Sequence, residues 1–417
     1  MTYAPPPWPD RPGSPDPAAS VPTAASFVSP LAQPQHAPGA YIPPSPVPVS
    51  GSVDSVPTLP RKGRRVSIWL FALLAVLLIG LVGYFLTFLG ASASIIGMIV
   101  ALVPFAVVLF AVRTIDRWEP EPRGLVVFAV AWGAIASVGI ALLVDLGIIL
   151  LIGNSDSSAR DLFSTVVQAP VVEEVAKALG LLLIFVTARR AIDGPVDGIV
   201  YGALVGAGFA FTENIQYFAI SYLDGGAGDL TATFFVRGIL SPFAHAMFTA
   251  VAGFALGLAA RRGATGGRAL GALGLGLIGA IALHAFWNGS AMLGDFFGLY
   301  LTLQVPLFIG FMLGILALRR EEARLTHARL GEYASAGWFT AQEVDMLATP
   351  AGRREALRWS KTLRTDRSPI MRAFIADATA LAAARQRAIS GRDASAAEDE
   401  RVLLARTAAA RASLLSI

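Results

Sequence analysis

The chain has 417 residues, 55% of them hydrophobic and only 15% charged, and this composition excludes an ordinary soluble globular domain. It has no cysteine, which excludes disulfides, a thiol nucleophile and cysteine ligands for zinc. Its net charge of +4 does not indicate nucleic-acid binding, because the basic residues lie beside the hydrophobic segments, where they orient a membrane protein. We therefore expect a lipid bilayer as the solvent and no nucleic-acid partner.

The N-terminal segment 1–60 holds most of the chain's 26 prolines, with Ser, Ala and Gly between them. Such a segment cannot bury a core, so we predict a disordered tail. It lacks the features of a signal peptide and leads into a basic cluster before the first hydrophobic run, formed by Arg61, Lys62, Arg64 and Arg65. These features place the N-terminus in the cytoplasm.

Apolar runs of roughly 20 residues then recur, separated by short polar breaks, as spanning helices require. We predict about eight transmembrane helices within a membrane domain at 61–320, at residues 66–89, 94–112, 124–152, 162–187, 196–220, 234–260, 269–293 and 299–318. Arginines gather in the loops that this arrangement places in the cytoplasm. The exceptions are Arg160 and Arg237, at span ends where a long side chain can snorkel to the interface.

The segment 321–417 is charged, rich in alanine and helical in pattern, and Thr340 with Glu343 predicts a capping box at a helix start. We expect a helical cytoplasmic tail. The predicted fold is therefore an all-α, multi-pass helix bundle in the cell membrane, with both termini in the cytoplasm.

Several ionisable residues lie within the predicted spans, where each costs roughly 2.5–3.5 kcal/mol on insertion scales and calls for a partner or a function. The fourth span carries Glu173, Glu174 and Lys177, with the lysine one turn beyond both carboxylates and able to pair with either. The fifth span carries Glu213 followed by Asn214, and a buried glutamate there needs a counter-ion.

Two of the chain's four histidines, His245 and His284, lie in the sixth and seventh spans, and Asn288 lies one turn after His284. At 1.5 Å per residue, Glu173 lies about 16 Å, the two histidines about 14 Å and Glu213 about 11 Å below the outer surface. We therefore expect these groups to share one layer. Asp145 in the third span lies at a similar depth, and the sequence assigns it no role.

Histidine and glutamate side chains from four helices at one depth are the expected geometry for a divalent metal such as zinc, with water at an open position. A metal hydrolase also needs a carboxylate that takes a proton from water, and adjacent glutamates can divide the two roles. The alternatives are a structural ion-pair network, a transporter with a proton or ion pathway, or a non-enzymatic scaffold that binds membrane partners. The sequence has no HExxH motif.

At these residues the chain resembles the PrsW family of intramembrane metalloproteases, which are related to CAAX prenyl proteases and bacterial immunity-type membrane proteases. The resemblance covers roughly 66–320 and rests on four motifs in order, namely EExxK from Glu173, FxxxEN from Phe209, His245, and HxxxN from His284. The CAAX branch has an arginine after its glutamate pair and a histidine where this chain has Glu213, which puts prenylated substrates in doubt.

The resemblance implies an intramembrane endopeptidase that cleaves membrane-anchored proteins, typically anti-sigma factors, with a divalent metal, zinc being the expected ion. By the same resemblance, Glu173 or Glu174 is the base that activates water. His245 and His284 bind the metal, Glu213 assists binding, and Asn288 stabilises the oxyanion. The alternative for Asn288 is an ordinary interhelical hydrogen bond.

Overall fold

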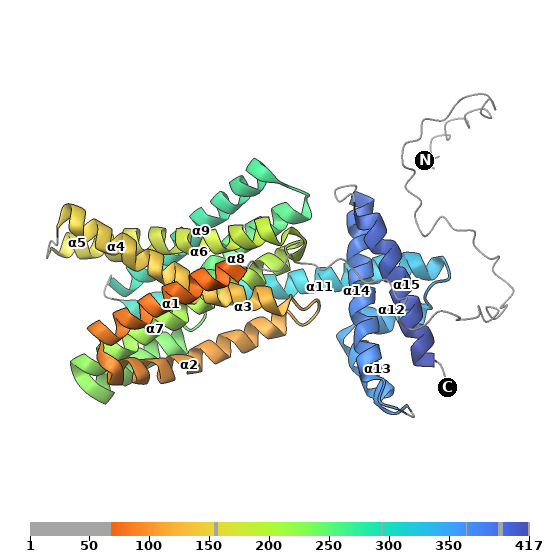
Figure 1. Ribbon diagram of the computed structural model, residues 1–417, viewed down its shortest axis with the longest axis horizontal. Helices are drawn as coiled ribbons and strands as arrows, with labels where there is room; N and C mark the ends of the chain where they lie inside the picture. The colour runs from red at the N-terminus through yellow and green to blue at the C-terminus, as the bar shows by residue number, and fades with distance from the viewer. Residues whose placement is uncertain (1–67, 154–156, 293–294, 364, 391–394, 416–417) are drawn as a thin grey trace, which may run out of the picture.

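The computed structural model describes residues 68–153, 157–292, 295–363, 365–390 and 395–415. The predicted tail and the basic cluster that follows it lie outside the described residues. Every regular element of the described residues is a helix, and they contain no strand, as predicted for an all-α protein. Figure 1 shows an elongated bundle that contains α1 to α9 and a smaller group of helices, α12 to α15, with α11 running between them.

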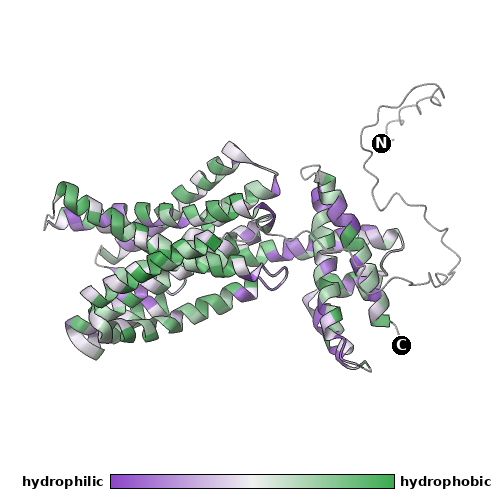
Figure 2. Cartoon of the chain, viewed as in Figure 1, coloured by the Kyte–Doolittle hydropathy of each residue, from purple (hydrophilic) through white to green (hydrophobic). Residues whose placement is uncertain are grey.

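The helices of the bundle and of the connection are α1 (Ile68–Phe88), α2 (Gly90–Ile115), α3 (Arg123–Ala131), α4 (Val138–Ile152), α5 (Ser158–Phe163), α6 (Ala169–Thr187), α7 (Pro195–Phe234), α8 (Ala244–Arg261), α9 (Gly266–Met292), α10 (Phe296–Leu299) and α11 (Val305–Ser335). Hydrophobic residues dominate the bundle, and hydrophilic residues concentrate in α12 to α15 and the adjoining part of α11 (Figure 2). This distribution fits a membrane domain followed by a polar helical tail.

Six helical stretches of the described chain are long and apolar enough to span a membrane. One of them, Pro195–Arg261, has 67 residues and would be about 100 Å long if straight, so it contains two of the predicted spans. The predicted span 162–187 is not among the six because it carries three charged residues, yet it is helical from Ser158 to Thr187. Each of the eight predicted spans therefore corresponds to a helical segment.

The break expected between spans 196–220 and 234–260 is a sharp turn within α7, which continues to Phe234. Its direction changes at Gly225 and Gly226, which have non-helical dihedral angles, and the φ of 62° at Gly226 favours glycine. Two glycines thus make the turn for which we expected a loop. The following helix is also shorter than predicted, since α8 begins only at Ala244.

Glycines allow α7 and α8 to approach closely, as their four-residue spacing predicts. A Cβ atom on Gly202 would lie 2.6 Å from the carbonyl oxygen of Thr249, and one on Gly257 would lie 2.9 Å from the Cα of Pro195. Contacts this short leave no space for a larger side chain. The α7–α8 pair forms the centre of the bundle, where Tyr201 is fully buried.

π-Helical turns interrupt the helices at Trp132–Ser137, Ser164–Gln168, Phe235–Leu240 and Tyr300–Gln304. A π-turn inserts an extra residue into an α-helix and occurs frequently at functional sites. Two of these turns border a cavity of about 840 Å³ in the bundle, and they bring Gln168 and Arg237 to its wall.

The polar tail is helical as predicted, with α12 (Ala341–Ala348), α13 (Pro350–Lys361), α14 (Ser368–Ser390) and α15 (Ala396–Leu415). These helices and the end of α11 share a second hydrophobic core that includes Leu330, Tyr333, Leu347, Phe374 and Leu381. The predicted capping box opens α12. The Thr340 hydroxyl accepts from the Glu343 backbone N–H at 3.1 Å, and the Glu343 carboxylate accepts from the Thr340 N–H at 2.8 Å.

One contact between tail and bundle involves the loop before α3. The buried Arg353 donates to the carbonyl oxygen of Trp118 at 3.1 Å, and its guanidinium lies 3.4 Å from the centre of the Trp118 ring. Burial lowers the pKa of this guanidinium to about 10, so it remains charged at neutral pH.

A second contact involves the loop 188–194, which joins α6 to α7. Arg387 of α14 pairs with Asp193 at 2.7 Å. Arg190 donates to the Ser395 hydroxyl at 2.7 Å, next to the start of α15. The tail therefore holds the connection between two helices that carry candidate site residues.

Candidate active site

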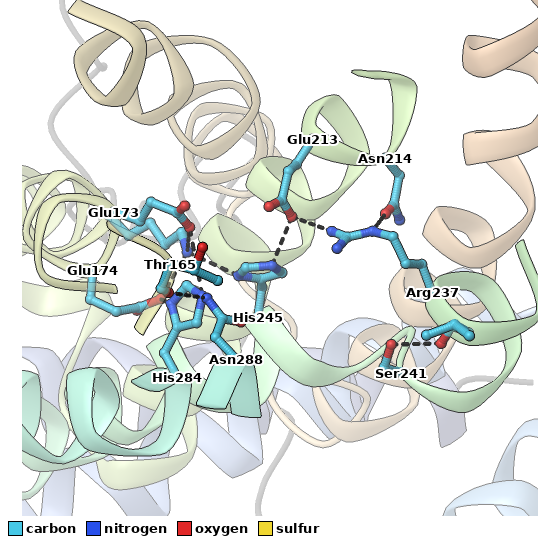
Figure 3. A network of polar contacts seen from close by, with 12 residues as sticks. Thr165, Glu173, Glu174, Glu213, Asn214, Arg237, Ser241, His245, His284 and Asn288 are labelled. Carbon is cyan, nitrogen blue, oxygen red and sulfur yellow. Dashed lines mark hydrogen bonds and ion pairs between the residues drawn. The ribbon is translucent and has the colours of Figure 1, made fainter. Parts of the chain in front are cut away.

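The candidate residues predicted from the sequence converge in the bundle, as their common depth predicts (Figure 3). Glu173 and Glu174 come from α6, Glu213 from α7, His245 from α8 and His284 from α9. Three of them, Glu173, Glu213 and His245, line a cavity of about 840 Å³.

Glu174 is the most enclosed of the carboxylates, with a side chain only 1% exposed. Its Oε1 lies 2.8 Å from Lys177 Nζ and 3.1 Å from His284 Nδ1. Its Oε2 accepts a hydrogen bond from the Thr249 hydroxyl at 3.0 Å. Both oxygens are thus occupied by protein groups, and the carboxylate fixes the orientation of the His284 ring.

Glu173 has fewer contacts and lines the cavity. Its Oε2 lies 3.3 Å from Lys177 Nζ and 3.9 Å from His284 Nε2. Lys177, which is fully buried, therefore contacts both carboxylates, and the predicted pairing is confirmed. The two neighbouring glutamates differ clearly, because one is enclosed and the other faces open space.

Lys177 also connects the glutamate pair to His245. Its ammonium lies 3.1 Å from His245 Nδ1 and 3.8 Å from the centre of the Phe209 ring. Phe209 is the first residue of the FxxxEN motif, and its ring lies 5.3 Å from the His245 ring. The motif phenylalanine thus covers the lysine and packs beside the histidine.

Glu213 lies on the other side of His245, with its Oε2 2.8 Å from His245 Nε2. Its counter-ion is Arg237, which pairs with this same oxygen and donates to Asn214 Oδ1 at 2.7 Å. Arg237, which we expected at a span end, thus pairs with two residues of the FxxxEN motif. The turn at Gly225 and the π-turn that follows bring the arginine back toward the site.

Sequence reasoning missed Arg237 and Thr249 as members of the site. Thr249 lies one turn after His245 on the same helix, α8. A signal for Arg237 was present, because a buried Glu213 requires a positive partner and this arginine is the next cation along the chain.

Asn288 lines the cavity, and its Nδ2 donates to the backbone carbonyl of Thr165 at 2.9 Å. This contact joins α9 to the π-turn before α6, so the structure contains the interhelical hydrogen bond that was the alternative to an oxyanion role. An amide carries two N–H donors, so a second one remains for another acceptor.

Asp145 of α4 also lines the cavity, where it is exposed and accepts a hydrogen bond from Gln168 Nε2 at 3.1 Å. It therefore faces the same space as Glu173 and is separate from the ion-pair network around Lys177.

The donor groups fit a metal ion. Glu173, His245 and His284 each offer one ligand atom, and these atoms all lie within 4.8 Å of one another. Two imidazoles and a carboxylate are a common donor set of catalytic zinc. Within the network, three carboxylates face the cations Lys177 and Arg237, so the group has a surplus of negative charge that suits a cation.

Comparison with known proteins adds a family relationship. A family model described as PrsW family intramembrane metalloprotease matches residues 121–313. The chain is 30% identical over 144 residues to a protein named Protease PrsW from Geobacillus kaustophilus (strain HTA426), covering 34% of this chain and 58% of the relative. It is 27% identical over 157 residues to a protein of the same name from Clostridioides difficile (strain 630), covering 37% and 63%. The chain thus spans about three-fifths of the curated relatives it matches, and no solved structure matches.

Proposed function

We propose that the chain, which a PrsW family model matches over residues 121–313, is an intramembrane, metal-dependent endopeptidase of that family. The single observation that carries this proposal is the meeting of Glu173, His245 and His284, whose ligand atoms lie within 4.8 Å of one another, beside a cavity that Glu173 and His245 line. Ionisable groups at this depth are costly, so their convergence points to chemistry.

We assign the metal to His245 and His284, with zinc as the expected ion. Glu173, whose ligand atom lies within 4.8 Å of both histidines, is left for the water, and Glu213, at 2.8 Å from His245 Nε2, assists metal binding. When bound, the metal supplies Lewis acidity that polarises the scissile carbonyl and activates water. Glu174 supports this assignment, because it holds His284 Nδ1 and leaves Nε2 of that ring for the metal. Lys177 and Thr249 in turn hold Glu174.

Glu173 is the proton acceptor in this proposal. It faces the cavity, and its polar contacts, at 3.3 and 3.9 Å, are the longest of the three carboxylates, whereas both oxygens of Glu174 are occupied and Glu213 is held by Arg237. A general base must reach the water that attacks the peptide, and Glu173 alone combines access with freedom to move. It then returns the proton to the leaving amine.

Asn288 contributes to the oxyanion site in this scheme. One N–H of its amide is held by the Thr165 carbonyl, which fixes the amide, and the second remains for the carbonyl oxygen of the substrate. A positioned amide donor of this kind is worth about 3–4 kcal/mol in enzymes where one has been removed.

The substrate class is a membrane-anchored protein that enters the cavity from the bilayer beside α4, with anti-sigma-factor-like regulators as the expected members. Only Val138 of α4 is buried, while Leu143, Leu146 and Leu150 are exposed, so this helix packs loosely against the bundle. Both chain ends lie in the cytoplasm in this arrangement.

Co-reconstitution with single-span substrates tests the proposal. The wild-type protein is expected to carry about one metal per chain and to release a truncated product, and Glu173→Gln is expected to keep the metal and lose cleavage. The matched control is Asp161→Asn, an exposed carboxylate on α5. Substrate cleaved equally by wild type and Glu173→Gln, or by protein stripped of metal, contradicts the assignment.

A further inference from the structure

Asp145 is the one charged residue of α4, a helix whose other exposed side chains are mostly leucine, isoleucine and valine. It lies within a candidate membrane span and faces the cavity that contains Glu173. A carboxylate at such a depth costs several kcal/mol on most scales and is retained where it meets a partner or performs a function.

Within the described part of the chain, no ion pair is found for Asp145. Its contact is the neutral amide of Gln168, which donates to Oδ1 at 3.1 Å. The cation on the same cavity wall, Arg237, is engaged by Glu213 and Asn214. The cavity thus presents a hydrogen-bonded carboxylate to whatever occupies it.

The position of Asp145 relative to Glu173 follows from Gln168. This glutamine precedes Glu173 by five residues in one continuous helical stretch, so it lies about 7.5 Å away along the helix, toward the α4–α5 turn. An extended peptide advances about 3.3 Å per residue. A peptide whose scissile bond lies at Glu173 therefore places a residue about two positions away beside Asp145.

We propose that Asp145 is a specificity determinant that pairs with a lysine or arginine of the substrate, about two residues from the scissile bond on the side of the α4–α5 turn. This inference rests on the proposed protease function. The substrate class becomes a membrane-anchored protein with a basic residue inside its spanning segment. Such a residue is itself costly in the bilayer, and pairing with Asp145 relieves both charges.

The test uses single-span reporters that differ at one position, with lysine or methionine placed at successive distances from the mapped cleavage site. Binding is measured by energy transfer in vesicles with the Glu173→Gln protein, so the readout does not depend on turnover. Lysine two residues from the bond is expected to bind about tenfold more tightly than methionine. Asp145→Asn in the same background is expected to abolish this preference, and Asp161→Asn to retain it.

A charge exchange controls for misfolding. Asp145→Lys is expected to prefer a reporter with glutamate at the same position, which a merely damaged protein does not do. Equal binding of lysine and methionine reporters, or a lysine preference that survives Asp145→Asn, overturns the inference. Cleavage of the reporters by the protein with Glu173 intact is scored separately. Cleavage without the preference leaves the protease function standing, and preference without cleavage contradicts the function but not the role of Asp145.

Discussion

Replacement of Lys177 by methionine removes the positive charge at the centre of the network with little change of shape. The lysine side chain is fully buried and lies 2.8 Å from Glu174, which is 1% exposed. Removal of one partner from a buried ion pair costs about 3–5 kcal/mol, because the other charge is left uncompensated. We expect Lys177→Met to lower the free energy of unfolding by this amount.

A matched control is provided by Glu398 and Arg401 in α15, which have the same three-residue spacing. Their side chains are 62% and 61% exposed, and exposed pairs contribute only about 0–1 kcal/mol. Arg401→Met is therefore expected to change the unfolding free energy very little. The difference between the two variants isolates the effect of burial.

The assay is reversible unfolding of metal-stripped protein in mixed micelles, titrated with a denaturing detergent and followed by tryptophan fluorescence. Metal is removed because a ligand that binds the folded state adds its own stabilisation. The double variant Lys177→Met with Glu174→Gln is expected to recover about 0.5–3 kcal/mol relative to simple addition of the single effects. If Lys177→Met proves as mild as Arg401→Met, the buried-pair reasoning is refuted.

Three further predictions concern packing and charge. Gly202→Val is expected to lower the unfolding free energy by about 1–3 kcal/mol in the same titration, because a Cβ there meets the Thr249 carbonyl; an unchanged value argues against close α7–α8 packing. Arg237→Met removes the positive partner of Glu213 and adds to the surplus of negative charge, so it is expected to tighten metal binding, whereas Arg237→Lys stays close to wild type; metal titration measures both. Arg353→Met leaves two buried carbonyl groups without this donor and is expected to cost about 1–3 kcal/mol, detected as faster limited proteolysis of the tail.

The convergence of the site could be predicted from the sequence because burial of charge is costly everywhere in a membrane. Glu173, His245 and His284 stand out against apolar surroundings, and counting residues along each helix gives their depth. The fully buried Lys177 could be anticipated too, since its partners lie one turn away on the same helix. The spacing of residues along each helix and the apolar environment of the bilayer are therefore sufficient to predict that these side chains meet.

The remainder depended on features that residue spacing along a single helix does not give. Arg237 reaches Glu213 because a two-glycine turn and a π-turn direct it inward, whereas its position in the sequence suggested a span end. The contact of Arg353 with Trp118 joins residues 235 positions apart, and the sequence around either residue does not indicate the other as its partner. The different roles that we propose for Glu173 and Glu174 likewise depended on which of the two side chains faces the cavity.

The connection between α6 and α7 has a consequence for protein engineering. Arg387 and Arg190 tie the loop 188–194 to the tail, although the family match ends before the tail begins. A tail transplanted from a related protein would meet this loop without the partners that hold it here. A functional chimaera would therefore have to exchange the loop 188–194 together with the tail, although the two segments are far apart in the sequence.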